Sequence, residues 1–247
     1  MDIKTKRKYG VFLTPKERRI ERYEKLRLQL MERYNIKKLS TQQIRYLEKG
    51  VRYQGIYDIE TTDFNPYQNF IICFVFHRRD IITGEIEKTV CSISKKDITE
   101  AVSRNNFDFD YTLLQKLSKC IFSVDQIVGH YSTKFDNGYF KARCLLTKQN
   151  KLVPDYLDKM SSDTWRMMKT TLKAPRNTLN NLILITTGTS QKTHVDLKFW
   201  YKVKFKDSPH WQKSMNYIVD HCKKDVNMTV KALKVIEPFN AVSGASF

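Results

Sequence analysis

A run of seven apolar side chains at residues 70–76, FIICFVF, constrains the fold of this chain more than any other feature. A strand built from such a run has no polar face, so it must be buried on both of its faces. Hydrophobic residues make up 41% of the 247 residues, which is enough for a core that covers such a strand. The run therefore favours a layered α/β protein over a disordered chain.

Strands and helices alternate around this run. Residues 56–60 alternate at period two, and further strands are predicted at residues 85–94, 126–130 and 161–165. Helices are predicted at residues 113–121, 135–146, 177–185 and 209–236, the last with a long apolar stripe. Residues 192–207 are compatible with a hairpin or with irregular structure. Together these segments predict five strands accompanied by helices.

The first fifty residues differ from the rest of the chain. They hold 15 Lys/Arg and 6 Asp/Glu, a net charge of +9, and the segments starting at Thr14 and Ser40 have the sequence of capping boxes. Two helices are therefore predicted there. We expect a basic helical extension over residues 1–50, a main domain over 51–238 and a loose tail over 239–247. The extension fits an arm that binds nucleic-acid backbone, or a solvated hairpin whose charge aids solubility.

The net charge of the whole chain is +18. A surplus of this size favours a polyanionic partner, above all nucleic acid, although anionic membranes and acidic proteins attract the same kind of surface. No segment is apolar for long enough to span a bilayer, and the basic N-terminus has no apolar signal-peptide core. The five cysteines form no C-x-x-C pair, so reduced thiols in an intracellular protein are expected.

Paired carboxylates stand at the end of the first predicted strand. Asp58 and Glu60 are two residues apart, so both side chains point to the same face of the strand. Two like charges at close range repel each other unless a cation lies between them. Oxygen ligands of this kind suit hard divalent cations such as Mg²⁺. Alone, the D-x-E pattern also fits a solvated strand end.

Two further carboxylates follow in predicted helices. Asp136 falls in the first turn of a helix that follows the strand ending near Gly129, where the helix dipole favours an acidic residue. His221 and Asp225 are four residues apart, so they share a face of the last helix at the edge of its apolar stripe. Taken singly, each has an ordinary structural explanation, such as an ion pair with a neighbouring lysine.

In this order the three motifs resemble those of the DEDD superfamily of 3′–5′ exonucleases. The sequences of the motifs are most similar to those of the proofreading domains of family B DNA polymerases and of related stand-alone exonucleases. There the first motif commonly reads D-I-E-T, as at Asp58 to Thr61, and the second G-x-N-x-x-x-F-D with a following aromatic and a basic residue. Gly129, Phe135, Asp136, Tyr139 and Arg143 match in register. The resemblance covers residues 51–237.

The resemblance implies a ribonuclease H-like fold, in which helices flank a mixed five-stranded sheet, and a two-metal mechanism with Mg²⁺ or Mn²⁺. The implied metal ligands are Asp58, Glu60, Asp136 and Asp225, with Asp136 acting mainly through water. His221 would orient or deprotonate the attacking water. The implied substrate-binding residues are His130, Tyr131 and Phe135.

Two positions depart from the family pattern. The asparagine of the second motif is Tyr131 here, which affects how the substrate end is held. His221 stands at the spacing of the tyrosine subclass, Y-x-x-x-D, whereas the histidine subclass has one more residue between, a position occupied here by Asp220. Tyr217, one turn earlier, is a less favoured substitute for His221.

The resemblance implies a 3′–5′ exonuclease that releases nucleoside 5′-monophosphates from DNA or RNA, with DNA favoured. The alternatives are a ribonuclease H-like endonuclease and a catalytically silent nucleic-acid-binding module on the same fold. The four retained carboxylates argue against the silent module, because clustered negative charge repels phosphates. No membrane association is expected. A replication or repair protein remains open as a partner, and the expected location is cytoplasmic or nucleoid-associated, or a host cell for a viral source.

Overall fold

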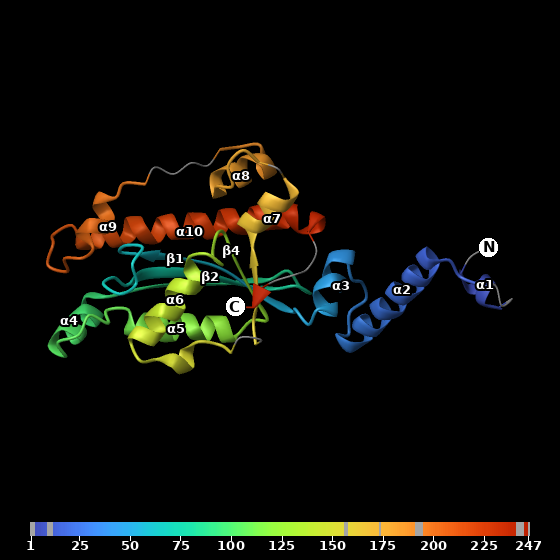
Figure 1. The fold of residues 1–247 in the computed structure, drawn as a ribbon, viewed down its shortest axis with the longest axis horizontal. Coiled ribbons are helices and arrows are strands. Elements are labelled where there is room, and N and C mark those ends of the chain that lie inside the picture. Colours follow the sequence, from blue (N-terminus) through green and yellow to red (C-terminus); the bar gives the residue numbers. More distant parts are fainter. Residues whose placement is uncertain are drawn as a thin grey trace. The chain divides into compact units, whose positions relative to one another are not determined.

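A computed structural model describes residues 3–8, 12–155, 158–172, 174–190, 195–240 and 245–246. The chain divides into two compact units, Met1–Val51 and Arg52–Phe247. Figure 1 shows the elements of both.

The first unit is helical. It contains α1 (Ile3–Lys8), α2 (Pro15–Arg33) and α3 (Thr41–Glu48). Both predicted capping boxes are present: the side chain of Thr14 accepts from Glu17 N at the start of α2, and that of Ser40 accepts from Gln43 N at the start of α3. The short helix α1 was not predicted. Its basic side chains contact α2 through two ion pairs, which join Lys6 to Glu17 and Arg7 to Glu21.

The second unit is built on one mixed sheet. Its strands are β1 (Tyr53–Thr61), β2 (Ile71–Asp80), β3 (Ile86–Ser92), β4 (Gln126–Gly129), β5 (Met160–Asp163) and β6 (Ala245–Ser246), in the order β3-β2-β1-β4-β5-β6. The β1–β4 and β4–β5 pairs are parallel, and the other pairs are antiparallel. The five predicted strands are therefore confirmed. The sixth, β6, lies within residues 239–247, where the sequence predicted a loose tail; residues 241–244 and 247 lie outside the described part.

The apolar run forms the buried strand that the sequence predicts. Ile72, Cys73, Phe74 and Val75 are wholly buried, which requires cover on both faces of β2. One face packs against α10 (Trp211–Ile236) and the other against α5 (Tyr111–Phe122). In Figure 1, α10 runs along one side of the sheet, while α5 and α6 (Asp136–Leu146) lie on the other.

Several shorter elements differ from prediction. Helices α4 (Lys95–Ser103) and α7 (Thr164–Thr171) were not predicted, and α8 spans Leu179–Thr187. Within residues 192–207, the hairpin alternative is wrong for the described part, because α9 (Lys198–Lys202) forms there; residues 191–194 are not described. Short 3₁₀ turns occur at Asn150–Leu152 and Glu237–Phe239.

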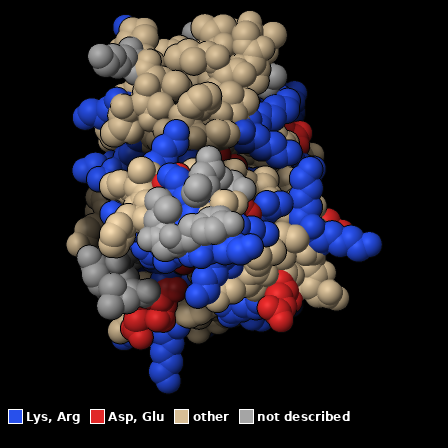
Figure 2. All heavy atoms as spheres, turned by 90° about the vertical axis from the view of Figure 1, so that its right-hand side faces the viewer, with Lys and Arg blue, Asp and Glu red and all other residues tan. Residues whose placement is uncertain are grey.

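The surface is strongly basic. Lys and Arg far outnumber Asp and Glu on the face drawn in Figure 2, in keeping with the net charge of +18. Among the described helices, none combines the length and the apolar character needed to cross a bilayer.

Candidate active site

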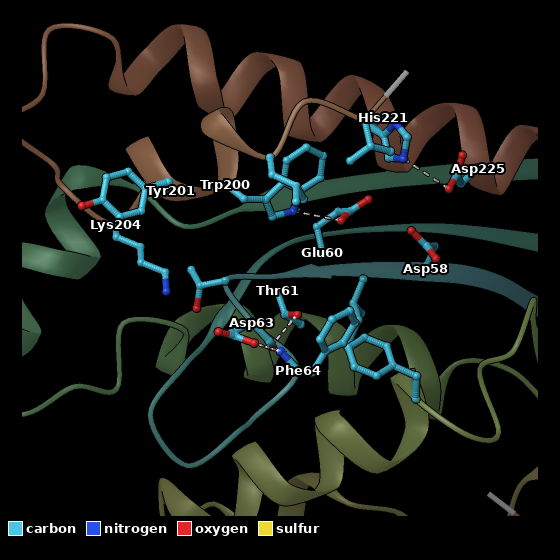
Figure 3. A pocket seen from close by; sticks show the side chains of 15 residues that line it. Asp58, Glu60, Thr61, Asp63, Phe64, Trp200, Tyr201, Lys204, His221 and Asp225 are labelled. Atoms are coloured by element: carbon cyan, nitrogen blue, oxygen red, sulfur yellow. Dashed lines mark hydrogen bonds and ion pairs between the residues drawn. The ribbon is translucent and has the colours of Figure 1, made fainter. Parts of the chain in front are cut away.

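A pocket of about 550 Å³ opens where β1 ends. Its walls come from the end of β1, the following residues 62–64, Phe135, the segment around α9 and the middle of α10. Figure 3 shows carboxylates of β1 and side chains of α10 facing each other across this pocket. Segments far apart in the sequence therefore supply its polar groups.

Strand β1 presents Asp58 and Glu60 to the pocket. Because side chains alternate along a strand, Tyr57 points to the opposite face, where its hydroxyl donates to Asn137 Oδ1 at 2.6 Å. This buried hydrogen bond ties β1 to α6 and fixes the rotation of the strand. One ligand atom each of Asp58, Glu60 and Cys222 lies within 4.8 Å of the others. The carboxylates of Asp58 and Glu60, which the D-x-E pattern predicts on one face of the strand, thus lie close together in the pocket.

Helix α10 contributes His221 and Asp225. His221 Nε2 lies 3.6 Å from Asp225 Oδ2, one helical turn away. Cys222 is buried between the helix and β1, and its thiol donates to the backbone carbonyl of Asp58 at 3.4 Å. Since this contact joins α10 to β1, it sets how far Asp225 stands from Asp58.

Burial and mutual repulsion disturb the protonation of these carboxylates. Burial, followed by the charges of Asp136, Glu60 and Asp225, raises the pKa of Asp58 well above its ordinary value. Burial and the charge of Asp225 raise the pKa of Glu60 to about 8. Burial raises the pKa of Asp225 too, although His221 and Lys224 oppose this. Without a cation, the cluster therefore holds protons at neutral pH.

Asp136 lies beside β1, bonded to its backbone, and does not line the pocket. It is buried at the start of α6, and its Oδ1 accepts from the backbone N–H of Ile59 at 3.1 Å. Burial raises its pKa to about 7, while this hydrogen bond acts in the opposite direction. Asp136 adds to the repulsion on Asp58 and Glu60, so it belongs to the same electrostatic cluster.

The three residues predicted to bind substrate are placed differently. Phe135 lines the pocket and packs edge-on against Phe64, with ring centroids 5.8 Å apart. His130 and Tyr131 do not line it. The ring nitrogens of His130 bond Thr164 Oγ1 and the carbonyl of Asn177.

Tyr131, at the usual asparagine position, has a left-handed backbone with φ of 65° and a half-exposed ring. Asparagine tolerates this backbone region better than tyrosine does. Substrate contact by His130 and Tyr131 stays a prediction.

Sequence reasoning missed Trp200. Its indole Nε1 donates to Glu60 Oε2 at 3.3 Å, and its ring meets the rings of His221 and Tyr217 edge-on. The aromatic triplet at residues 199–201 was the available signal. Tyr217, one of the two alternatives to His221, stacks on the ring of Phe199.

Asp220 is largely exposed and pairs with Lys223, and it does not line the pocket.

A buried ion pair supports one wall of the pocket. Arg143 donates to both carboxylate oxygens of Asp110, at 2.9 and 2.7 Å, and to the carbonyl of Pro66. Asp110 also accepts from Ile71 N at the start of β2. Through these bonds the pair fixes the loop between β1 and β2, which carries Phe64.

No protein-family model matches the sequence, and no curated protein matches it. Among solved structures, a similar one is that of the family B DNA polymerase from the hyperthermophilic archaeon Pyrobaculum calidifontis, with 14% sequence identity and a TM-score of 0.52. In fold, the chain resembles part of this polymerase. The match covers 76% of this chain and 25% of the polymerase chain, so this chain spans about a quarter of that protein. The predicted α/β, ribonuclease H-like fold is confirmed.

Proposed function

We propose that this protein is a metal-dependent 3′–5′ exonuclease. The observation that carries the proposal is the convergence of Asp58 and Glu60 from β1 with Asp225 and His221 from α10 in one pocket. The order of the three motifs and the likeness in fold to a family B DNA polymerase support a nucleic-acid substrate. The basic net charge supports it as well.

The donor set fits hard divalent cations. Asp58, Glu60 and Asp225 offer carboxylate oxygens, the ligands that Mg²⁺ and Mn²⁺ prefer, and their raised pKa values reflect a repulsion that a cation would relieve. Burial raises the pKa of the nearby Cys222 thiol, so it stays protonated and is a poor ligand. These three carboxylates, with Asp136 beside β1 acting mainly through water, would hold two ions. When bound, such ions neutralise charge on the phosphate and lower the pKa of water.

The side chains of the pocket would then position the attacking water and the carboxylates. Water attacks the phosphorus, the bond from phosphorus to the preceding 3′ oxygen breaks, and a nucleoside 5′-monophosphate leaves. His221, held beside Asp225, orients this water and accepts its proton. Trp200 holds the Glu60 carboxylate in place through its indole N–H.

The rim of the pocket fits an unpaired strand end. Phe64 and Tyr201 line the pocket and are exposed, and Phe135 lies behind Phe64. Exposed aromatic rings stack on unpaired bases whatever their sequence. Lys204 also lines the pocket and supplies positive charge for a phosphate. We therefore expect single-stranded 3′ ends to be degraded faster than blunt duplex ends.

The direct test uses single-stranded and duplex DNA and RNA, labelled at the 5′ end, with Mg²⁺, Mn²⁺ or EDTA. The expected product is a ladder that shortens from the 3′ end, only with metal. Asp58→Ala and Asp225→Ala should abolish it, because each removes a metal ligand. The matched control is Asp220→Ala, which removes an exposed carboxylate of the same helix and should keep activity. Equal cleavage of circular and linear strands would instead identify an endonuclease. Near wild-type turnover by Asp58→Ala in Mg²⁺ would refute the proposal.

A further inference from the structure

One face of α2 carries a row of basic side chains. Four basic residues and the neutral Gln29 recur at intervals of four, three, four and four residues, so they lie along one side of the helix: Arg18, Arg22, Lys25, Gln29 and Arg33. All five are exposed. With a rise of 1.5 Å per residue, this α2 stripe is about 22 Å long.

Two acidic residues of α2, Glu17 and Glu21, are engaged by α1. Lys6 Nζ lies 2.7 Å from Glu17, and Arg7 makes two hydrogen bonds to Glu21. Arg7, and to a smaller extent Lys25, lowers the pKa of Glu21. The short basic helix thus neutralises two of the four glutamates of α2, and the side chains of the stripe remain exposed.

The arginines of the stripe have no ion pair within the described part of the chain. Arg18, Arg22 and Arg33 lie outside all ion pairs there, whereas Arg27, off the stripe, pairs with Glu24. Glu32 is the exposed carboxylate that borders the row near its C-terminal end. Three guanidinium groups at helical spacing present planar forks that pair bidentately with phosphate oxygens.

The alternative partner, an anionic membrane, needs an apolar surface next to the basic one. Of the two exposed apolar residues of α2, Ile20 stands on the opposite side of the helix, and Leu28 is a single apolar side chain that borders the row beside Lys25. Tyr23, Leu26 and Leu30 are half-buried or buried within the unit. The stripe therefore lacks the apolar half of an interfacial helix.

We propose that the α2 stripe, which belongs to the other compact unit than the carboxylate pocket, is a binding surface for nucleic-acid backbone without a part in the chemistry of that pocket. A row of this length spans several phosphates of one strand, and each contact releases a condensed counterion. The proposal goes beyond the exonuclease activity, and it stands even if the pocket proves inactive.

The test measures binding of the full chain to fluorescein-labelled 20-nucleotide single strands and 20-base-pair duplexes, in EDTA, over a series of salt concentrations. The stripe variant carries R18Q, R22Q, K25Q and R33Q. The matched control carries K16Q, K37Q, K38Q and R45Q, which remove the same charge from exposed sites of the same unit off the stripe. Far-UV circular dichroism verifies the helices, and the single change R22Q provides a milder variant.

If all four contacts are made, the log–log salt slope of the stripe variant falls by about 2.8 on single strands or 3.6 on duplexes. The single change R22Q should lower the salt slope by about a quarter of the fall seen in the stripe variant. The control variant should lower the slope by less than half of that fall. An unchanged slope in the stripe variant, or an equal fall in the control, overturns the proposal. So does loss of binding to phosphatidylserine vesicles in the stripe variant while nucleic-acid binding is kept. Cleavage is not measured, so the outcome is independent of the proposed exonuclease.

Discussion

The indole N–H of Trp200 points at the carboxylate of Glu60, with 3.3 Å between Nε1 and Oε2. The two residues are 140 positions apart in the sequence. Trp200 also contacts the His221 ring, so a single side chain touches both sides of the carboxylate cluster. The hydrogen bond lowers the pKa of Glu60, against the stronger effect of burial. It therefore favours the ionised carboxylate, which is the form that binds a cation.

Trp200→Phe is predicted to slow hydrolysis while keeping most of the packing. Losing a hydrogen bond to a charged group costs about 1.5 kcal/mol, which corresponds to a roughly tenfold fall in turnover. Because the pKa of Glu60 should rise further, the acidic limb of the pH–rate profile should move to higher pH. The control is Trp165→Phe, outside the pocket, for which kcat should not change. An unshifted acidic limb in Trp200→Phe would show that the contact only packs the site.

His221→Ala is predicted to lower kcat by ~10²-fold or more, the usual contribution of a positioned acid–base group. His221→Tyr should keep measurable activity, because the spacing matches the tyrosine subclass. Single-turnover assays with saturating metal and substrate separate this effect from binding. If alanine is harmless, the water is activated by another group. Tyr217 is then the next candidate, because it lies one turn away, whereas Asp220 is exposed and pairs with Lys223.

The spacing of residues within single segments accounts for most of the elements and site residues that could be predicted from the sequence. The run at β2, the long stripe of α10 and the D-x-E pair at the end of β1 each have a periodicity that the fold preserves. Other elements have no such signal. Strand β5 reads MSSD, and its Ser161 and Ser162 are buried polar residues rather than an apolar run. Because hydrophobic periodicity sets no boundary in such a segment, the strand was expected over residues 161–165, whereas α7 already begins at Thr164.

Helix α9 shows a second reason for failure. It has five residues and no side-chain cap at its start, so its own sequence specifies little. Its conformation depends on tertiary packing, above all the stack of Phe199 on Tyr217 of α10. Trp200 could not be assigned to the pocket before α9 was placed.

The stability of the metal-free protein is predicted to fall as pH rises from about 5 to 9. The pKa of Glu60 is raised from 4.5 to about 8 by folding. The protonated Glu60 side chain therefore contributes its full share to the free energy of unfolding below pH 4.5, and this contribution is lost as the pH rises through about 8. Glu60→Gln should escape this loss, so its melting temperature should exceed that of the wild type by a few degrees at pH 9 in EDTA. Adding Mg²⁺ or Mn²⁺ at pH 9 should raise the melting temperature of the wild type but not that of Glu60→Gln.

The control for this experiment is Glu48→Gln, which neutralises an exposed carboxylate in the helical unit. Its melting temperature should follow that of the wild type at every pH. A constant difference between wild type and Glu60→Gln from pH 5 to 9 would contradict the raised pKa.

The buried pair of Arg143 and Asp110 yields the last prediction. Arg143→Met should destabilise the protein by about 3–5 kcal/mol, because it leaves the Asp110 carboxylate buried without its partner. Adding Asp110→Asn should recover part of this loss, since it removes the buried charge and keeps an acceptor for Ile71 N. The free energy of unfolding in urea measures both. A cost below about 1 kcal/mol for Arg143→Met would mean that water reaches Asp110. Because the same pair fixes the loop that carries Phe64, the double variant should bind single strands more weakly even where it stays folded.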